Sequence, residues 1–210
     1  MRRALFLVTA VATLAACAES PTQVVDTTPL FTITSAGPVV ATATGSGHAL
    51  CGDDGAFCYS TDEDRALRTF TFTAQVREDG STRGKAEFNN RGRDQAWHAD
   101  IECVYFRPDK PNQAWIAGTL TRGYGQAPAP SGIPYAAGAR VLFAVEDNGQ
   151  GGTATAPDRI MGFGTIPEAQ YQAVCNFPEV FPSAQLEFFM QLFGFNPIRG
   201  DIQVRPPSAD

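Results

Sequence analysis

The sequence predicts an all-β protein built on one antiparallel sheet. Residues 69–76 place Phe70, Phe72, Ala74 and Val76 in alternation with threonine and glutamine, which is the two-residue period of a half-buried strand. Four more strand-like segments, each bounded by turn residues, follow at 83–89, 96–106, 114–121 and 140–146. About eight short strands joined by hairpins predict an antiparallel barrel, up-and-down and calycin-like, or a two-sheet sandwich.

The connections support an antiparallel order. Asp79-Gly80 is a hairpin signal, so the strands on either side of it should pair directly. The glycine- and proline-rich segment 123–138 cannot be a central strand, and we expect it to run over the surface.

Further strands are expected near both ends of this domain. Residues 38–44 alternate valine and alanine with threonine, and we expect Gly45 and Gly47 to end that strand. Weaker strand patterns lie at 159–163 and 200–205.

One short C-terminal helix is expected at residues 183–193, with Ser183 as its N-cap. Its apolar stripe at positions i, i+3, i+4 and i+7 consists of Leu186, Phe189, Met190 and Phe193. Because the helix is short and lacks a basic polar face, we expect the stripe to pack on a sheet rather than enter a membrane. Residues 168–174 indicate one or two further helical turns.

The N-terminus has the features of an export signal. Arg2 and Arg3 precede an apolar run at residues 4–13, which is too short to cross a bilayer as a helix. The sequence Leu14-Ala15-Ala16-Cys17 follows and resembles the bacterial lipobox. That resemblance implies transfer of diacylglycerol to Cys17, cleavage before it and acylation of the new N-terminus. The alternative is ordinary secretion with cleavage near Ala16 or Ala18.

The expected domain organisation is a signal peptide at 1–16, a lipidated Ser/Thr/Pro-rich tether at 17–36 and a single β domain at 37–207. Two or three acyl chains give stable anchoring without a spanning segment. The predicted location is therefore the cell envelope, with the membrane as a partner through the lipid anchor. Because Ala18 follows the cysteine, sorting to the outer membrane is expected if the organism has one.

The charge of the chain excludes two classes of function. The formal net charge is −6, and loss of Arg2 and Arg3 with the leader makes it two units more negative. An acidic chain without a basic run is a poor binder of nucleic acid and a poor polybasic binder of membranes.

The cysteines fit an oxidising compartment. With Cys17 lipidated, the four that remain predict two disulfides with three connectivities open. Cys51 and Cys58 enclose a short turn-rich loop that can close locally, which leaves Cys103 to join Cys175. The absence of a Cys-x-x-Cys pair argues against a redox pair and against a zinc knuckle.

The most site-like cluster is a glycine-bent loop with Asp147 and Asn148, followed by Asp158. Hard oxygen ligands on such a loop suit calcium, although the spacing does not match an EF-hand and Asp-Asn-Gly is also a common turn. Calcium is the sole cofactor hypothesis. A second acidic cluster comprises Asp53, Asp54, Asp62, Glu63 and Asp64.

A histidine and two carboxylates share one face of the strand at 96–106: His98, Asp100 and Glu102. They could ligate a transition metal or perform acid–base chemistry. Side chains in line on one strand do not converge, so we favour a solvated outer face. The opposite, apolar face is then formed by Trp97, Ala99, Ile101 and Cys103.

Five sequence blocks resemble a family of secreted bacterial proteins of unknown function. They lie at 68–74, 79–90, 98–103, 114–118 and 145–151. The resemblance implies an extracytoplasmic β domain and supplies no activity, ligand or catalytic residue.

Three functions are compatible with these observations. The first is non-catalytic binding of a small ligand or surface partner, which an open cavity with convergent polar groups would favour. The second is a structural envelope lipoprotein with a filled core. The third is a barrel-type hydrolase or isomerase that uses His98 and a carboxylate. The sequence contains no nucleophile elbow, zinc-protease motif or phosphate-binding loop, so an enzyme is the less favoured class.

Overall fold

The computed structural model describes residues 37–49, 67–91, 94–125, 132–149, 156–176, 182–195, 197 and 199–208. These residues are mostly β, with nine strands and two short helices, so the all-β prediction is confirmed. The strands are β1 (Val39–Ala49), β2 (Arg68–Arg77), β3 (Thr82–Asn90), β4 (Gln95–Phe106), β5 (Gln113–Tyr124), β6 (Arg140–Glu146), β7 (Arg159–Ile166), β8 (Gly194–Phe195) and β9 (Arg199–Arg205). The helices are α1 (Glu168–Asn176) and α2 (Ser183–Phe193).

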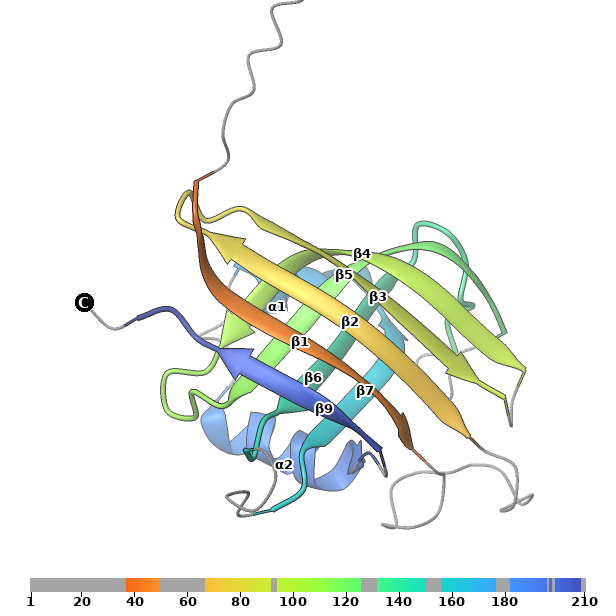
Figure 1. Cartoon of the computed structure of the whole chain (residues 1–210). Coiled ribbons are helices and arrows are strands. Elements are labelled where there is room, and N and C mark those ends of the chain that lie inside the picture. The colour runs from red at the N-terminus through yellow and green to blue at the C-terminus, as the bar shows by residue number, and fades with distance from the viewer. Residues whose placement is uncertain are drawn as a thin grey trace, which may run out of the picture. The chain divides into compact units, whose positions relative to one another are not determined.

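All nine strands belong to one sheet in the order β8-β7-β6-β5-β4-β3-β2-β1-β9, and every neighbouring pair is antiparallel. From β1 to β7 the chain moves up and down between adjacent strands. The sheet curls so that β9, β1 and β2 cross in front of β5–β7 (Figure 1). Phe72 on β2 contacts Phe143 on β6 edge-on at 5.4 Å between ring centroids. The architecture is therefore a curled half-barrel, and the sandwich alternative is not observed.

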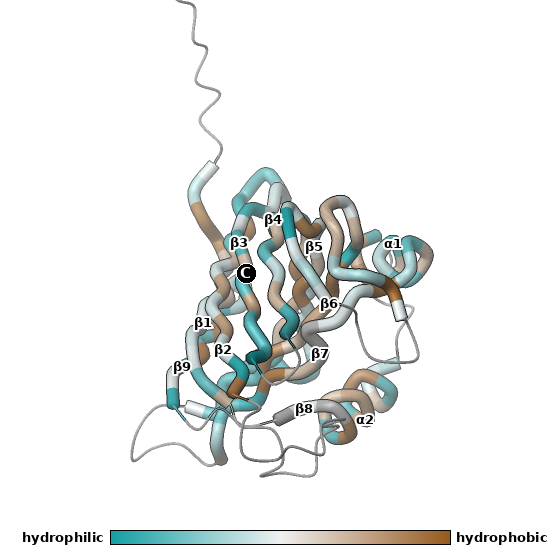
Figure 2. The backbone as a smooth tube through the Cα atoms, turned by 90° about the vertical axis from the view of Figure 1, so that its right-hand side faces the viewer, coloured by the Kyte–Doolittle hydropathy of each residue, from teal (hydrophilic) through white to brown (hydrophobic). Residues whose placement is uncertain are grey.

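The interior of the half-barrel is filled by side chains. Trp97, Phe72, Phe143, Ile116 and Leu120 are at most 2 % exposed and belong to one core cluster. Burial of each large apolar side chain contributes about 1.5–3 kcal/mol, so this layer is the main source of stability. Hydrophobic and hydrophilic residues alternate along the strands in Figure 2, as expected for strands with one buried face.

Both helices cover the outer face of the sheet over its β4–β7 part. Leu186 and Met190 of α2 are buried against Trp115, Ala144 and Met161, so the prediction that the stripe packs on a sheet is confirmed for these two residues. The helix α1 buries Tyr171 and Val174 against the same face. The expectation of one C-terminal helix was incomplete, because residues 168–174 extend into a full second helix.

The expected N-cap of α2 was wrong. Pro182 occupies the cap position and makes no side-chain cap hydrogen bond. Ser183 is the first helical residue, and its side chain helps to lower the pKa of the Asp109 carboxyl group.

The predicted end of β1 at Gly45 was also wrong, because the strand continues to Ala49. A Cβ atom at Gly45 would lie 2.7 Å from the Phe72 ring, and one at Gly47 would lie 2.6 Å from the carbonyl oxygen of Arg199. These glycines therefore permit close packing against neighbouring strands and rings, which is the other common use of glycine in a strand.

The segment 123–138 is only partly a surface excursion. Its first residues extend β5 to Tyr124. Tyr135 is 3 % exposed and joins the main core, and its amide donates to the Gly125 carbonyl at 3.1 Å. The Thr165 hydroxyl donates to the Ile133 carbonyl at 2.8 Å. The described part of this connection thus covers one end of the core.

The disulfide between Cys103 and Cys175 is confirmed, with a Cα–Cα distance of 5.5 Å. It joins β4 to α1. The expectation that Cys103 shares the inner face with Ile101 was wrong, because a register shift between these residues moves Cys103 to the outer face beneath α1. Cys17, Cys51 and Cys58 lie outside the described residues.

Candidate functional site

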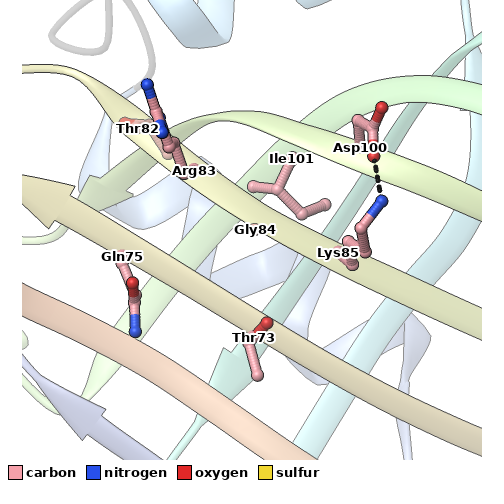
Figure 3. Close-up of a pocket in the computed structure, with 8 residues that line it drawn as sticks. All are labelled: Thr73, Gln75, Thr82, Arg83, Gly84, Lys85, Asp100 and Ile101. Atoms are coloured by element: carbon pink, nitrogen blue, oxygen red, sulfur yellow. Dashed lines mark hydrogen bonds and ion pairs between the residues drawn. The ribbon is translucent and has the colours of Figure 1, made fainter. Parts of the chain in front are cut away.

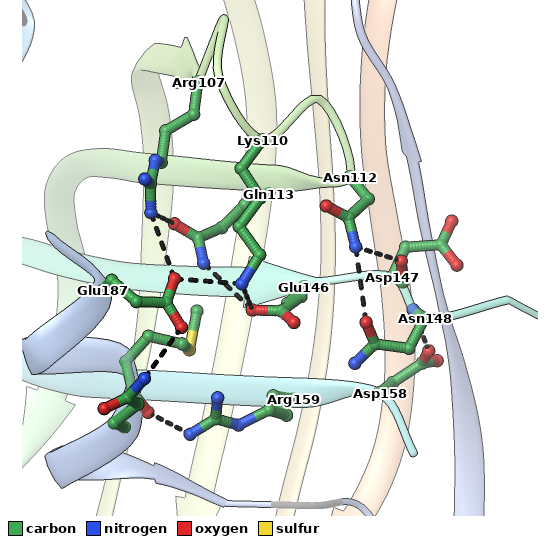
Figure 4. Close-up of polar contacts among 12 residues, drawn as sticks. Arg107, Lys110, Asn112, Gln113, Glu146, Asp147, Asn148, Asp158, Arg159 and Glu187 are labelled. Atoms are coloured by element: carbon green, nitrogen blue, oxygen red, sulfur yellow. Dashed lines mark hydrogen bonds and ion pairs between the residues drawn. The ribbon is translucent and has the colours of Figure 1, made fainter. Parts of the chain in front are cut away.

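The loop predicted to bind calcium lies where β9, at one edge of the curled sheet, approaches β6. We call this line the seam of the half-barrel, and Figure 4 shows Asp147, Asn148 and Asp158 of the loop. The Asp158 carboxylate accepts the amide of Asn148 at 2.9 Å and the amide of Ile202 at 3.0 Å. The Asp147 carboxylate accepts the amide of Gly149 at 2.9 Å and the amide of Val204 at 3.0 Å. Two carboxylates therefore bind the backbone N–H groups on the free edge of β9.

This arrangement gives the two acidic residues a structural role at the edge of the sheet. Unpaired N–H groups on an edge strand invite pairing with another chain, and a carboxylate that accepts them blocks that pairing. Burial raises the pKa of Asp158, although its two backbone hydrogen bonds oppose that shift. Each carboxylate oxygen already accepts one N–H donor, so calcium binding, which stays a prediction, would have to use the remaining lone pairs of these oxygens or replace these bonds.

No described part of the chain brings three or more His, Cys, Asp and Glu side chains into an arrangement that could hold a metal ion. The second acidic cluster, at Asp53, Asp54, Asp62, Glu63 and Asp64, lies outside the described residues.

A buried charge network fixes α2 to the sheet (Figure 4). The Arg107 side chain is only 4 % exposed and donates to Asp109 at 2.6 Å, to Gln113 at 2.7 Å and to Glu187 of α2 at 3.3 Å. Lys110 donates to both Glu146 and Glu187 at 2.9 Å. The hydrogen bonds of this network join the β4–β5 turn and strands β5 and β6 to α2. Its role is therefore structural.

A second network holds α1. Arg140 donates to Glu168 at 2.7 Å and to Glu102 at 3.0 Å, and its guanidinium lies 4.1 Å from the centre of the Tyr171 ring. The Tyr171 hydroxyl donates to Glu102 at 2.5 Å. Burial and this hydrogen bond raise the pKa of Tyr171 to about 12. Glu102 therefore binds α1 and does not converge with His98.

The part of the sheet that the helices leave uncovered carries ordered rows of polar side chains. The strand registers place six outward residues side by side across six strands, from β9 to β5: Arg199, His48, Thr69, Asn89, Ala96 and Tyr124. We call this the Tyr124 row. The next row, two residues along each strand, is Asp201, Ser46, Thr71, Glu87, His98 and Arg122, and we call it the Arg122 row.

A groove of about 540 Å³ lies along these two rows. Its outward lining consists of Ser46, His48, Thr69, Thr71, Glu87, Asn89, Ala96, His98 and Arg199. Because the interior of the half-barrel is filled, this groove is the principal candidate binding site among the described residues. Sequence alternation predicted which side chains face outward, but only the register shows that they form continuous rows.

His98 meets a carboxylate from another strand in this groove. Its Nδ1 atom lies 3.0 Å from Glu87 Oε1 on β3 and 3.4 Å from Arg122 Nη2 on β5. The prediction that His98, Asp100 and Glu102 face outward is supported, but these three residues do not form one site. Asp100 instead pairs with Lys85 at 2.9 Å.

That Lys85–Asp100 pair lines a second hollow of about 440 Å³ near the β2–β3 hairpin (Figure 3). The Lys85 side chain is 80 % exposed and that of Asp100 is 53 % exposed. Ion pairs at such exposure contribute little to stability or specificity, so we do not treat this hollow as the main site.

Four aromatic residues of β4 and β5 divide into two groups by burial. Trp97 is in the main core and Trp115 lies beneath α2, where Tyr105 is partly buried. Tyr124 alone is exposed, at 51 %, and it stands at the β5 end of its row. Only Tyr124 is therefore available to an external ligand.

No family model matches the chain, and no curated protein or solved structure is similar to it. The resemblances to the lipobox and to secreted bacterial proteins thus stay predictions. Neither described helix is long and apolar enough to cross a membrane.

Proposed function

We propose that the protein is a lipid-anchored domain of the cell envelope that binds a polar ligand or surface partner, without catalysis, on the outer face of β1–β4. The observation that carries this proposal is the groove along the Tyr124 and Arg122 rows. Hydrogen-bonding side chains line it on a face that no described helix covers. The sequence Leu14-Ala15-Ala16-Cys17 supports the anchor.

The filled interior bears on two alternatives: a ligand held inside the half-barrel, and a structural protein without a ligand. It argues against a ligand held inside the half-barrel, because the space there is occupied by Trp97, Phe72 and Phe143. It is also compatible with a structural envelope lipoprotein that binds nothing. Binding by the outer groove separates these two possibilities.

The anchor and the groove can be tested in one series. Cys17→Ser should abolish incorporation of labelled palmitate and release the protein from washed membranes, because the acylated thiol is gone. The released protein should still bind isolated cell envelopes through the groove. Adding Thr71→Arg and Asn89→Arg should weaken that binding by about tenfold or more. The two long charged side chains would occupy the groove and prevent the ligand from making several of its contacts there.

Thr73→Arg is the matched control, since Thr73 faces outward on the same strand as Thr71 but does not line the groove. Equal envelope binding by all of these unanchored variants would reject the groove and favour the structural alternative.

A second candidate is a hydrolase or isomerase, which the 3.0 Å contact between His98 and Glu87 favours. A carboxylate that orients a histidine is a common acid–base arrangement. If the protein hydrolyses chromogenic glycosides or esters, His98→Gln should lower kcat by about a hundredfold or more. Absence of turnover by the natural protein, or equal turnover by the variant, would reject this candidate.

A further inference from the structure

The groove lies within a longer strip formed by the two rows, which extends past the groove to Tyr124 and Arg122 on β5 and to Asp201 on β9. This strip has the shape of a binding site for an extended chain. Each row crosses six antiparallel strands, from Arg199 on β9 to Tyr124 on β5. With neighbouring strands about 4.8 Å apart, a row of six strands is roughly 24 Å long. The two rows are separated by two residues along a strand, or roughly 6.8 Å. A long, narrow polar strip of these dimensions suits a polymer laid across the strands better than a compact small molecule.

The side chains of the strip are those that bind hydroxyl groups. Ser46, Thr69 and Thr71 supply hydroxyls that donate and accept, and Asn89 supplies an amide that does both. Glu87 adds a carboxylate acceptor, and His98 adds an imidazole ring. The two side chains also contact each other, because the Nδ1 atom of His98 lies 3.0 Å from Glu87 Oε1. Ala96 lies between Asn89 and Tyr124 in its row, and its small side chain leaves room above the sheet.

The charges in the two rows are balanced. Arg199 and Arg122 stand at opposite ends of the strip, and Asp201 and Glu87 lie in the Arg122 row. Two cations and two carboxylates give no surplus that would select a polyanion, and the protein as a whole is acidic. Nucleic acids are therefore disfavoured, because their binding depends on a surplus of basic residues.

The strip also lacks the features of a protein-binding surface. Strong protein interfaces centre on clusters of buried aromatic and arginine anchors. Here a single aromatic residue, Tyr124, is exposed, and it lies at the end of its row. An isolated aromatic ring beside hydroxyl-binding groups instead matches the two surfaces of a sugar, whose C–H face packs on a ring while its hydroxyls form hydrogen bonds.

We propose that the strip, which includes the groove and Tyr124 beyond its β5 end, binds an uncharged glycan chain that lies across the strands. One sugar ring packs on Tyr124, and neighbouring sugars are hydrogen-bonded by Asn89, Glu87 and His98 in the groove. This inference rests on the proposed function, because it names the class of ligand for the same groove.

The test is an NMR titration of the full chain carrying Cys17→Ser with five hexasaccharides. Four are neutral (cellohexaose, chitohexaose, maltohexaose and mannohexaose) and one is acidic (hexagalacturonate). At least one neutral chain should shift amide resonances in both rows, from β1 to β5, and should bind at least about tenfold more tightly than its disaccharide because more contacts form. Tyr124→Ala should weaken that binding by about tenfold, and Arg83→Ala, outside the groove on β3, should leave it unchanged.

Three results would overturn the inference. One is the absence of amide shifts with all four neutral chains. A second is binding that Tyr124→Ala does not weaken. A third is tighter binding of hexagalacturonate that Arg122→Ala and Arg199→Ala abolish. In each case the envelope-binding series with Thr71→Arg and Asn89→Arg decides separately whether the groove is a binding site at all.

Discussion

Arg107→Met is expected to lower the free energy of unfolding by about 3–5 kcal/mol, because it removes the central cation of a buried network and leaves its partners uncompensated. The Arg107 side chain is 4 % exposed, and Gln113, which accepts from it, is fully buried. The measurement is urea denaturation followed by circular dichroism. Hydrogen exchange should show the largest loss of protection in α2, because Glu187 of that helix is one of the partners.

Lys85→Met is the matched control for this prediction. It also removes one cation from an ion pair of 2.9 Å, but that pair is exposed. Its expected cost is below about 1 kcal/mol, since water replaces the lost partner. If the two variants lost similar stability, burial would not be what makes the Arg107 network important.

The same network predicts a pH dependence. The Arg107 guanidinium lowers the pKa of Asp109 to about 2, from an ordinary value of 3.8. A carboxyl group with a depressed pKa stabilises the fold above its unfolded pKa, and that contribution is lost as the pH falls through the folded value. The stability difference between the natural protein and Arg107→Met should therefore shrink between pH 4 and about pH 2. Because Asp109 is half exposed, this effect is only part of the total.

Removal of the Cys103–Cys175 disulfide is expected to cost about 4 kcal/mol. The two cysteines are 72 residues apart, and a cross-link that closes so long a loop strongly restricts the unfolded chain. The double variant Cys103→Ala and Cys175→Ala should show this loss in urea denaturation under oxidising conditions. A loss below about 1 kcal/mol would indicate that the unfolded chain is not the state on which the cross-link acts.

A matched double variant tests the predicted local disulfide at the same time. Cys51→Ala with Cys58→Ala should cost about 2–3 kcal/mol if these residues form a disulfide, because their loop is short. Full stability of this second variant, together with free thiols at Cys51 and Cys58 in peptide mapping of the natural protein, would remove the prediction of a Cys51–Cys58 bond.

Local sequence signals predicted the elements whose causes are local. The Asp79-Gly80 turn has the expected glycine at positive φ (+79°), and the strands on either side of it pair as predicted. The bounds of β6 and α2 coincide with the predicted segments 140–146 and 183–193. Each of these elements is specified by residues within a few positions of one another.

The errors came from contacts between distant residues. The sequence alone predicts that Gly45 ends its strand, because the packing of Phe72 against this glycine is a contact between distant residues. It also predicts that Cys103 faces inward, because the register shift after Ile101 depends on pairing with β5. The role of Asp147 at the sheet seam also required the position of Val204, far along the chain. The groove could be anticipated only as an outward polar face, because the alignment of its rows depends on the register of five strand pairs.

The pairing of β9 with β1 bears on how the domain is made. These strands come from opposite ends of the described domain, with Thr42 opposite Arg205. Contacts between such remote segments close late and slow folding, because most of the chain must be ordered before they form. An exported chain would leave its secretion channel with β1 lacking its neighbour until the C-terminal residues emerge. A chaperone that shields the exposed edge of β1 during export would then protect the nascent domain from aggregation at its most vulnerable stage.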